Sequence, residues 1–246
     1  MALTKRQKMI SEKIEISKPY ILIDAIQLLL SLPKLKFNES VDISINLGVD
    51  PKKSDQNVRG SSSLPHGIGK ETKVAVFAEG SEATAAKKAG ADLIGFEDLI
   101  EEVKKNKNLD ADIVISTPEC MKSLGQLGRI LGPKNLMPNP KEGTVTKNIS
   151  GAVNNAKKGQ IRYKTDNAGI IHTTVGKIDF EANKLVENVH ALIDDLIKVK
   201  PPSMKGKYMK NITLSSTMGP GIKVDLASVE KRSWYAVKSR AKKRIS

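Results

Sequence analysis

The chain has 246 residues, a formal net charge of +14 and 39% hydrophobic residues. That hydrophobic content can build a packed core, so the chain is not a disordered basic tail, and its length suits one large domain or two smaller ones. The excess of Lys and Arg predicts an anionic partner, either nucleic acid or an anionic membrane. The longest apolar run, residues 25–32, is amphipathic and much shorter than the roughly 20 residues that cross a bilayer, which favours nucleic acid.

Two further features concern the cellular compartment. Cys120 is the only cysteine, so no intrachain disulfide can form, as is typical of a reducing cytoplasm. Residues 1–13 are basic and polar and no apolar segment follows them, so we expect no secretory signal.

The amino-terminal part predicts two helices, a strand and a long loop. Residues 4–16 are rich in Lys, Glu and Gln, which indicates a basic helix, and a second helix over 23–32 ends at Pro33. Residues 41–47 alternate apolar and polar side chains, which predicts a half-buried strand. Residues 50–70 contain Gly, Ser, Pro and charged side chains and are predicted to form a loop.

The middle of the chain changes to short apolar runs separated by helical patterns. Strands are expected at 74–78, 93–94 and 112–116, with helices over 82–89 and 97–105 between them and a later helix over 149–158. Strands and helices that alternate at this spacing predict a small parallel α/β unit.

Strict alternation returns in the last third of the chain. Strands at 161–165 and 170–175 are separated by residues 166–169, a hairpin-type turn. A long amphipathic helix follows over 182–198, and another strand over 208–216. Both ends of the chain therefore combine helices with antiparallel strands, and we predict one domain made of both ends with a second domain inserted as one continuous piece. The chain would pass from one domain to the other near residues 66–70 and return near residue 159. Two such connections between domains predict a hinge.

No enzyme motif is complete in this sequence. Gly67 and Gly69 begin a dinucleotide-binding pattern, but Thr72 stands where the third glycine belongs. A P-loop fails as well, because Glu71 follows Lys70 where Ser or Thr is needed. The three histidines are far apart and, with one cysteine, give no zinc-ligand spacing. These absences argue against an enzyme, although an active site can also be assembled from distant residues.

Two segments offer contacts to a nucleic acid. Residues 34–37 place lysines beside Phe37, which either clamps a nucleotide by charge and stacking or packs into the core. Residues 215–220 carry three hydroxyls, Met218 and a Gly-Pro turn, which either touch ribose and phosphate or form an ordinary polar turn. Aromatic residues make up only 4% of the chain, so folded RNA recognised by its shape and backbone fits better than a stacking platform for single strands.

Two further segments are cationic. Residues 127–145 combine Gly and Pro with cations, so they predict a loop of defined shape that either meets a ribose-phosphate backbone or merely closes a domain. Residues 230–246 hold seven Lys and Arg against one acid, and they form either a helix on an anionic partner or a disordered basic end.

Four blocks in order resemble the bacterial branch of the family of large-subunit ribosomal protein one, the protein of the mobile stalk beside the tRNA exit site. The blocks are residues 50–60, 64–67, 127–145 and 214–220, and the resemblance runs from about Leu3 to Asp225. Beyond Ala227 the tail departs from the family, so nothing is carried over onto it.

The resemblance implies the α/β fold class and two domains with a hinge. An α+β split RNA-binding domain with an antiparallel sheet would comprise 1–67 and 160–228, an inserted Rossmann-like three-layer α/β domain 68–159, and a basic extension 229–246. It further implies a cytoplasmic protein on the large ribosomal subunit that binds the stalk region of ribosomal RNA, helps to move or release exit-site tRNA, and represses translation of its own operon mRNA. No catalysis, cofactor, metal, DNA or membrane partner is implied.

The resemblance also implies a set of contact residues. The ribosomal RNA contacts carried over by motif are Lys36, Phe37, Ser40, Lys164, Asp166, Thr217, Met218 and Gly219. Asn211 stands where the family more often has serine, so a contact there is in doubt. Arg129, Lys134 and Lys141 give a possible contact to tRNA or to a second RNA segment. Two rival functions stay open: a nucleotide-using enzyme whose α/β domain binds phosphate at its strand ends, and a general DNA-binding protein.

Overall fold

The computed structural model describes residues 5–15, 18–33, 35–106 and 108–229 of the chain. The chain divides into two compact units: unit 1 comprises Met1–Val58 and Tyr163–Ser246, and unit 2 comprises Arg59–Arg162. Helices and sheets occur in both units, which confirms the predicted α/β fold class. The two units meet between residues 58 and 59 and between residues 162 and 163. The predicted domain ranges put these crossings at 67/68 and 159/160, which lie inside unit 2. The predicted hinge stays a prediction, and the basic extension lies, apart from Val229, outside the described residues.

Unit 1 is built on an antiparallel sheet. Its strand order is β7 (Ile170–Lys177), β1 (Ser40–Leu47), β8 (Met209–Ser216) and β9 (Ile222–Val224). β1 lies in the interior because its alternation buries every second side chain on one face, among them Ile43 and Ile45. The short strand β9 was not predicted, because three residues after a Gly-Pro turn give too little pattern.

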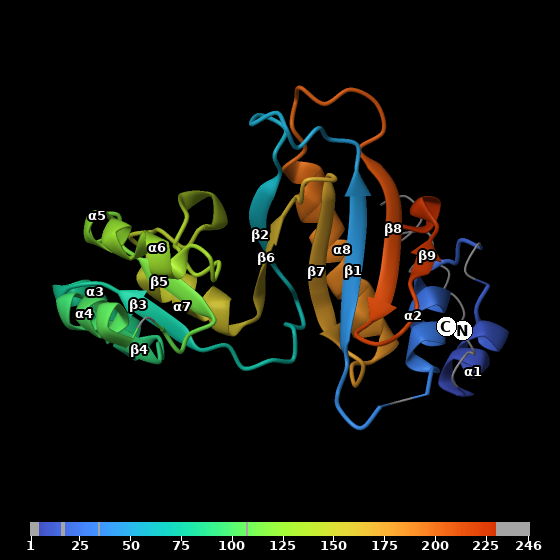
Figure 1. Ribbon diagram of the computed structural model, residues 1–246, viewed down its shortest axis with the longest axis horizontal. Helices are drawn as coiled ribbons and strands as arrows, with labels where there is room; N and C mark the ends of the chain where they lie inside the picture. Colours follow the sequence, from blue (N-terminus) through green and yellow to red (C-terminus); the bar gives the residue numbers. More distant parts are fainter. Residues whose placement is uncertain (1–4, 16–17, 34, 107, 230–246) are drawn as a thin grey trace, which may run out of the picture. The chain divides into compact units, whose positions relative to one another are not determined.

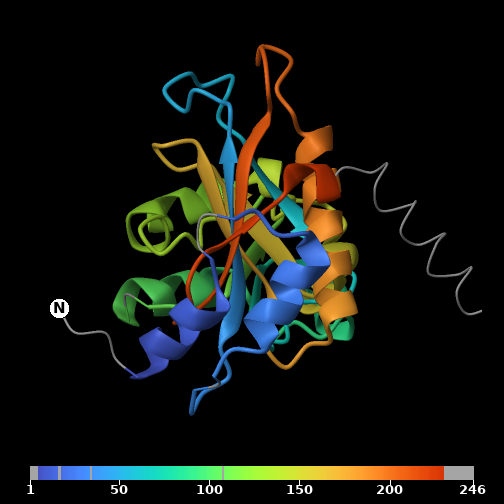
Figure 2. The same cartoon turned by 90° about the vertical axis from the view of Figure 1, so that its right-hand side faces the viewer.

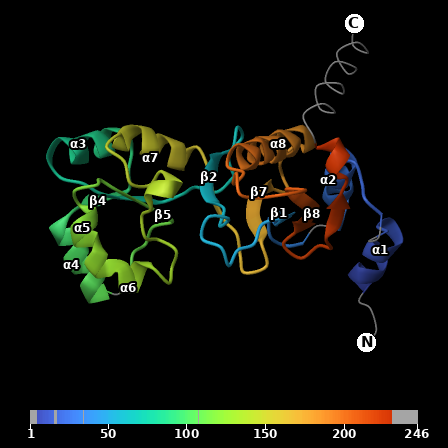
Figure 3. The ribbon, with the colours of Figure 1, turned by 90° about the horizontal axis from the view of Figure 1, so that it is seen from above.

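Two helices of unit 1, α2 (Leu22–Leu30) and α8 (Ala182–Lys198), lie on one face of this sheet. They pack beside each other, and both cover the face that holds the apolar side chains of β1 (Figures 1, 2 and 3). α1 (Lys5–Lys13) lies at the end of the sheet where β1 begins (Figure 1). Within the described ranges, no helix covers the opposite face, which presents Asp42, Ser44 and Asn46 from β1. A short 3₁₀ turn, η3 (Leu226–Ser228), follows β9.

Unit 2 contains the predicted parallel α/β arrangement. Its sheet has the order β4 (Leu93–Gly95), β3 (Val74–Phe77) and β5 (Ile113–Ser116), with both pairings parallel. α3 (Gly80–Lys88) and α7 (Ile149–Lys157) lie on one face (Figure 3). The other face is covered by α4 (Glu97–Asn106), α5 (Met121–Leu124), η1 (Gly125–Leu127) and α6 (Gly128–Leu131). α5 and η1 are too short for a sequence pattern to have shown them.

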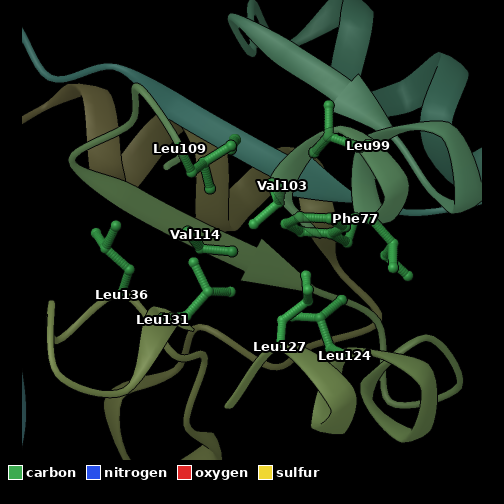
Figure 4. Close-up of a cluster of buried hydrophobic side chains, with 11 residues drawn as sticks. Phe77, Leu99, Val103, Leu109, Val114, Leu124, Leu127, Leu131 and Leu136 are labelled. Atoms are coloured by element: carbon green, nitrogen blue, oxygen red, sulfur yellow. The ribbon is translucent and has the colours of Figure 1, made fainter. Parts of the chain in front are cut away.

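Residues 127–145 close the second layer of unit 2. Leu127, Leu131 and Leu136 are buried in one apolar cluster with Phe77 and Val114 of the sheet (Figure 4). A 3₁₀ turn, η2 (Pro140–Glu142), ends at Gly143 with a positive φ of 70°. The predicted shape of the segment is therefore set by helical turns and by packing as much as by its Gly and Pro residues.

One predicted feature of the chain near the crossings was wrong. The predicted loop over 50–70 contains a strand, β2 (Arg59–Ser63), which pairs with β6 (Gln160–Lys164). Distant strands of matching pattern overrode the local loop signal, since strand pairing depends on tertiary context. The predicted turn over 166–169 is present: the N–H of Asp166 donates to the carbonyl of Ile170 at 3.0 Å, and the antiparallel Thr165–Ile171 bridge joins the end of β6 to β7.

The chain segments near the predicted crossings lie against each other. A Cβ placed on Gly159 would fall 2.7 Å from Cα of Gly67, so both positions depend on having no side chain. Both glycines also have a positive φ.

Candidate RNA-binding surface

Six of the predicted contacts gather where β1 begins and β8 ends. We call this group the sheet-end surface; it comprises Lys36, Phe37, Ser40, Thr217, Met218 and Gly219. The antiparallel register, with Val41 opposite Ser216, brings the two segments together although they are far apart in the sequence. Lys36 and Phe37 precede the first residue of β1, and residues 217–219 follow the last residue of β8.

Backbone and hydroxyl hydrogen bonds tie the two segments of the sheet-end surface together. The N–H of Ser40 donates to Oγ1 of Thr217 at 3.0 Å, and the N–H of Thr217 donates to the carbonyl of Ser40 at 3.1 Å. Nζ of Lys177 donates to Oγ of Ser40 at 3.1 Å. The Thr217 hydroxyl also donates to the carbonyl of Ser40, but at 3.5 Å this hydrogen bond is long, so the hydroxyl can turn to a closer oxygen outside the protein.

Two large apolar side chains of the sheet-end surface stand in solvent. Phe37 is 52% exposed and Met218 is 61% exposed. The alternative that Phe37 packs into the core is therefore wrong. A pocket of about 220 Å³ lies beside the ring and is lined also by Lys36, Glu39 and Ile178. The exposed ring of Phe37, the exposed thioether of Met218 and the lysine together suit a surface that stacks on or packs against nucleotides.

The other two predicted contacts, Lys164 and Asp166, lie at the opposite end of β1. Asp166 follows β6 in the turn that leads to β7, whose Ile170 pairs with Asn46 near the end of β1. At about 3.4 Å per residue, this end is roughly 20 Å from Ser40. The structure thus places the eight predicted residues in two groups, and it does not bring them into one cluster.

The turn that holds Asp166 keeps its carboxylate charged. Oδ1 accepts the N–H groups of Ala168 and Ile170, each at 2.8 Å. The N–H of Ile170 is the main reason that the pKa of Asp166 is lowered, and the N–H of Ala168 and the nearby His172 lower it further. Lys164 is exposed.

Polar side chains that the sequence analysis did not select connect the two groups along the open face. Oγ of Ser44 lies 3.1 Å from Nδ1 of His172, and Nε2 of His172 lies 3.5 Å from Oδ2 of Asp166. Oγ1 of Thr174 donates to Oδ1 of Asp42 at 2.6 Å. The alternation over 41–47 contained the signal, because it placed Asp42, Ser44 and Asn46 on one face. Asn211, exposed on β8, lies opposite Asn46.

A buried acid under the sheet-end surface was also missed. Glu39 is 3% exposed although the residues on its amino-terminal side, 36–38, are exposed. Its carboxylate Oε1 accepts the N–H of Met218 at 3.1 Å and lies 3.6 Å from Nη2 of Arg6. A single acid within a cationic, exposed segment was the only trace of it in the sequence.

The cations predicted in unit 2 lie on the outer side of residues 127–145. Arg129, Lys134 and Lys141 are exposed, while the leucines of the same segment fill the core. Nζ of Lys134 donates to Oδ1 of Asn108 at 2.6 Å. Both readings of the segment are therefore compatible with its structure: it closes the domain, and it presents cations to solvent.

Other chemistries find little support among the described residues. No group of three or more His, Cys, Asp or Glu side chains there could hold a metal ion. Cys120 is buried, and this burial raises the pKa of its thiol, as expected for a small packed residue. None of the helices in the described part of the chain is long and apolar enough to span a bilayer.

Comparisons with known proteins agree with the resemblance in the sequence. The model of the ribosomal protein L1p/L10e family matches residues 29–220. A large ribosomal subunit protein uL1 from Alkalilimnicola ehrlichii is 58% identical over 93% of this chain and 98% of its own length. Its counterparts from Thioalkalivibrio sulfidiphilus and a Marinomonas species are 59% and 57% identical, each over 92% of this chain, and these matches cover 98% and 97% of the two proteins.

Proposed function

The chain belongs to the ribosomal protein L1p/L10e family, and we propose that it docks on the stalk region of the large-subunit ribosomal RNA through the sheet-end surface. As a member of this family it is a structural, non-enzymatic component of the large ribosomal subunit and binds ribosomal RNA. The rival function of a nucleotide-using enzyme is thereby excluded.

The observation that carries the proposal is the combination of rigid backbone and exposed apolar side chains at the sheet-end surface. Single exposed apolar side chains are normal on a protein surface, but an exposed ring and an exposed thioether at the same end of a sheet, beside fixed polar groups, suit contact with a partner. Phe37 and Met218 are more than half exposed, while Ser40 and Thr217 beside them are held by hydrogen bonds. A preorganised surface of this kind fits a folded RNA, which is recognised by shape, by 2′-hydroxyls and by phosphates. Lys164 and Asp166 would extend it along the open face of the sheet.

Three finer roles belong to the same proposal. Unit 2, joined through two connections, would swing as a hinged body and help to move or release exit-site tRNA. Its outward cations, Arg129, Lys134 and Lys141, would then approach tRNA or a second RNA segment. The same sheet-end surface would also bind a matching structure in the chain's own operon mRNA and repress its translation.

The test compares a stalk fragment of ribosomal RNA with a scrambled transcript of equal length. The wild-type chain should prefer the stalk fragment, and its affinity should fall with salt at a log–log slope of about 0.9 or less for each neutralised phosphate. Thr217→Val removes the hydroxyl and should weaken binding to the stalk fragment while binding to the scrambled RNA stays the same.

Equal affinity of the wild type for both RNAs would contradict docking on the stalk. Equal losses of affinity for both RNAs in Thr217→Val would show that Thr217 makes no contact specific to the stalk fragment. Duplex DNA of the same length is the control for a general DNA-binding protein, which would show no preference for RNA.

A further inference from the structure

Glu39 directly precedes β1, and its side chain is buried although the pairing of the strand does not require this. A carboxylate that is only 3% exposed is rare unless it is paired, because leaving water costs a charged group much of its solvation. Ser40 and Thr217 already join β1 to β8 at this end through the hydrogen bonds between them. The strand pairing therefore closes without the side chain of Glu39.

The side chains of Glu39 and Arg6 converge on the backbone of one residue, Met218. Oε1 of Glu39 accepts the N–H of Met218 at 3.1 Å, and Nη1 of Arg6 donates to the carbonyl of Met218 at 3.2 Å. Nη2 of Arg6 lies 3.6 Å from Oε1 of Glu39, which makes the two side chains an ion pair. Both polar backbone groups of Met218 are thus held, while its side chain is 61% exposed.

The same arrangement controls charge beneath the surface. An unpaired carboxylate at this depth would repel the phosphates of an approaching RNA, and Arg6 neutralises it. Stability alone does not explain the pair, because buried ion pairs contribute little once desolvation is counted. Nε and Nη2 of Arg6 are buried and donate no hydrogen bond within the described residues, which further reduces any net gain.

We propose that Glu39 and Arg6 are positioning residues: together they fix the backbone of Met218 so that residues 217–219 present their hydroxyl and thioether to RNA in one geometry. Helix α1, at the amino-terminal end of the chain, thereby braces a turn more than two hundred positions away in the sequence. This inference rests on the proposed function of the sheet-end surface. Neither residue needs to touch RNA itself.

The test uses Arg6→Met with Lys8→Met as its matched control. Both variants remove one positive charge from α1, but Lys8 is exposed, and its side chain makes no ion pair or hydrogen bond with the described residues. Arg6→Met should lower the affinity for the stalk fragment by about tenfold, as expected when one fixed contact is lost, and leave the scrambled transcript unaffected. Lys8→Met should change the affinities for both RNAs equally and slightly. Arg6→Lys, which keeps the charge and one donor, should recover part of the loss.

Glu39 is tested through two substitutions of different severity. Glu39→Gln keeps an oxygen that can accept the Met218 N–H, so it should lose less stalk affinity than Glu39→Ala. The amide resonance of Met218 should shift in Arg6→Met and in both Glu39 variants and stay in place in Lys8→Met. The double variant Arg6→Met/Glu39→Gln should lose less than the sum of the single losses, because both residues act on the backbone of Met218.

Three outcomes would overturn the inference, and each is distinct from failure of the proposed function. An unchanged ratio of stalk to scrambled affinity in Arg6→Met, with Met218→Asp still lowering it, would show that the brace is not needed. A fall of the salt slope by about 0.9 in Arg6→Met would mean that Arg6 itself contacts a phosphate. An unchanged amide resonance of Met218 in Glu39→Ala would show that Glu39 does not position the backbone of Met218. Only a wild type that cannot distinguish the two RNAs contradicts the proposed function itself.

Discussion

The sheet-end surface of unit 1 and residues 127–145 of unit 2 use the same residue types in opposite ways. In unit 1, apolar side chains stand in solvent and an acid is buried beneath them to hold the backbone. In unit 2, the apolar side chains fill a core and the cations are outside. Exposed apolar groups over a fixed backbone indicate binding, whereas exposed cations over a packed core are also expected of an ordinary surface. This contrast is why we assign the primary RNA contact to unit 1.

The largest effect that follows from this comparison is on the stability of unit 2. Leu131 has no exposed surface, so Leu131→Ala should lower the free energy of unfolding by about 2–5 kcal/mol through lost burial and a cavity. The affinity of the folded protein for the stalk fragment should not change. Urea unfolding and RNA titration measure the two quantities. Arg129→Ala in the same helix, an exposed position, should change stability by at most about 0.5 kcal/mol; an equal cost for both variants would contradict the packing role.

The next effect is on RNA affinity in unit 1. Met218→Asp puts a negative charge on an exposed side chain at the sheet-end surface and should weaken stalk binding by about tenfold or more, while stability changes by less than about 0.5 kcal/mol. Ile197→Asp adds the same charge at a 43% exposed position of α8, on the helix-covered side of the sheet. If Ile197→Asp weakened stalk binding as much as Met218→Asp, the loss would reflect total charge and not the sheet-end surface.

A smaller effect concerns pH and the far end of β1. The pKa of Asp166 is lowered by the N–H groups of its turn, so the folded state favours the carboxylate. This stabilisation is present above the ordinary value of 3.8 and is lost as the pH falls through the lower pKa of the folded state. Asp166→Asn keeps an acceptor for the N–H groups but loses the charge. It should therefore be slightly less stable than the wild type at neutral pH, and the difference should disappear in acid.

Thermal unfolding at pH values above and below 3.8 measures this difference. Asp55→Asn removes an exposed carboxylate elsewhere in unit 1 and serves as the control. A difference between Asp166→Asn and the wild type that persists unchanged in acid would show that the substitution acts through packing.

The smallest effect is expected at the cations of unit 2. Lys134→Ala should change stalk affinity by less than about twofold and the salt slope by less than the 0.9 of one phosphate contact. Filter binding across a salt series measures both. A loss as large as that of Met218→Asp would reverse the comparison and make residues 127–145 a primary contact.

Local patterns in the sequence determined most of the secondary structure and the parallel arrangement of unit 2. The alternation over 41–47 and the apolar face over 182–198 are periodic, and periodicity shows directly which side chains a strand or helix buries. The family resemblance supplied the residues of the sheet-end surface, and the exposure of Phe37 then excluded a place in the core for this side chain.

Only the tertiary structure decided what depends on distant pairing. The β2–β6 pair follows from strands that meet across the fold, and the local loop signal over 50–70 cannot outweigh it. The division of the predicted contacts between the two ends of β1 follows from its antiparallel register with β7 and β8. Glu39 and Arg6 appear in the sequence as ordinary charged residues; their role depends on a carboxylate and a guanidinium that only folding brings to the backbone of Met218.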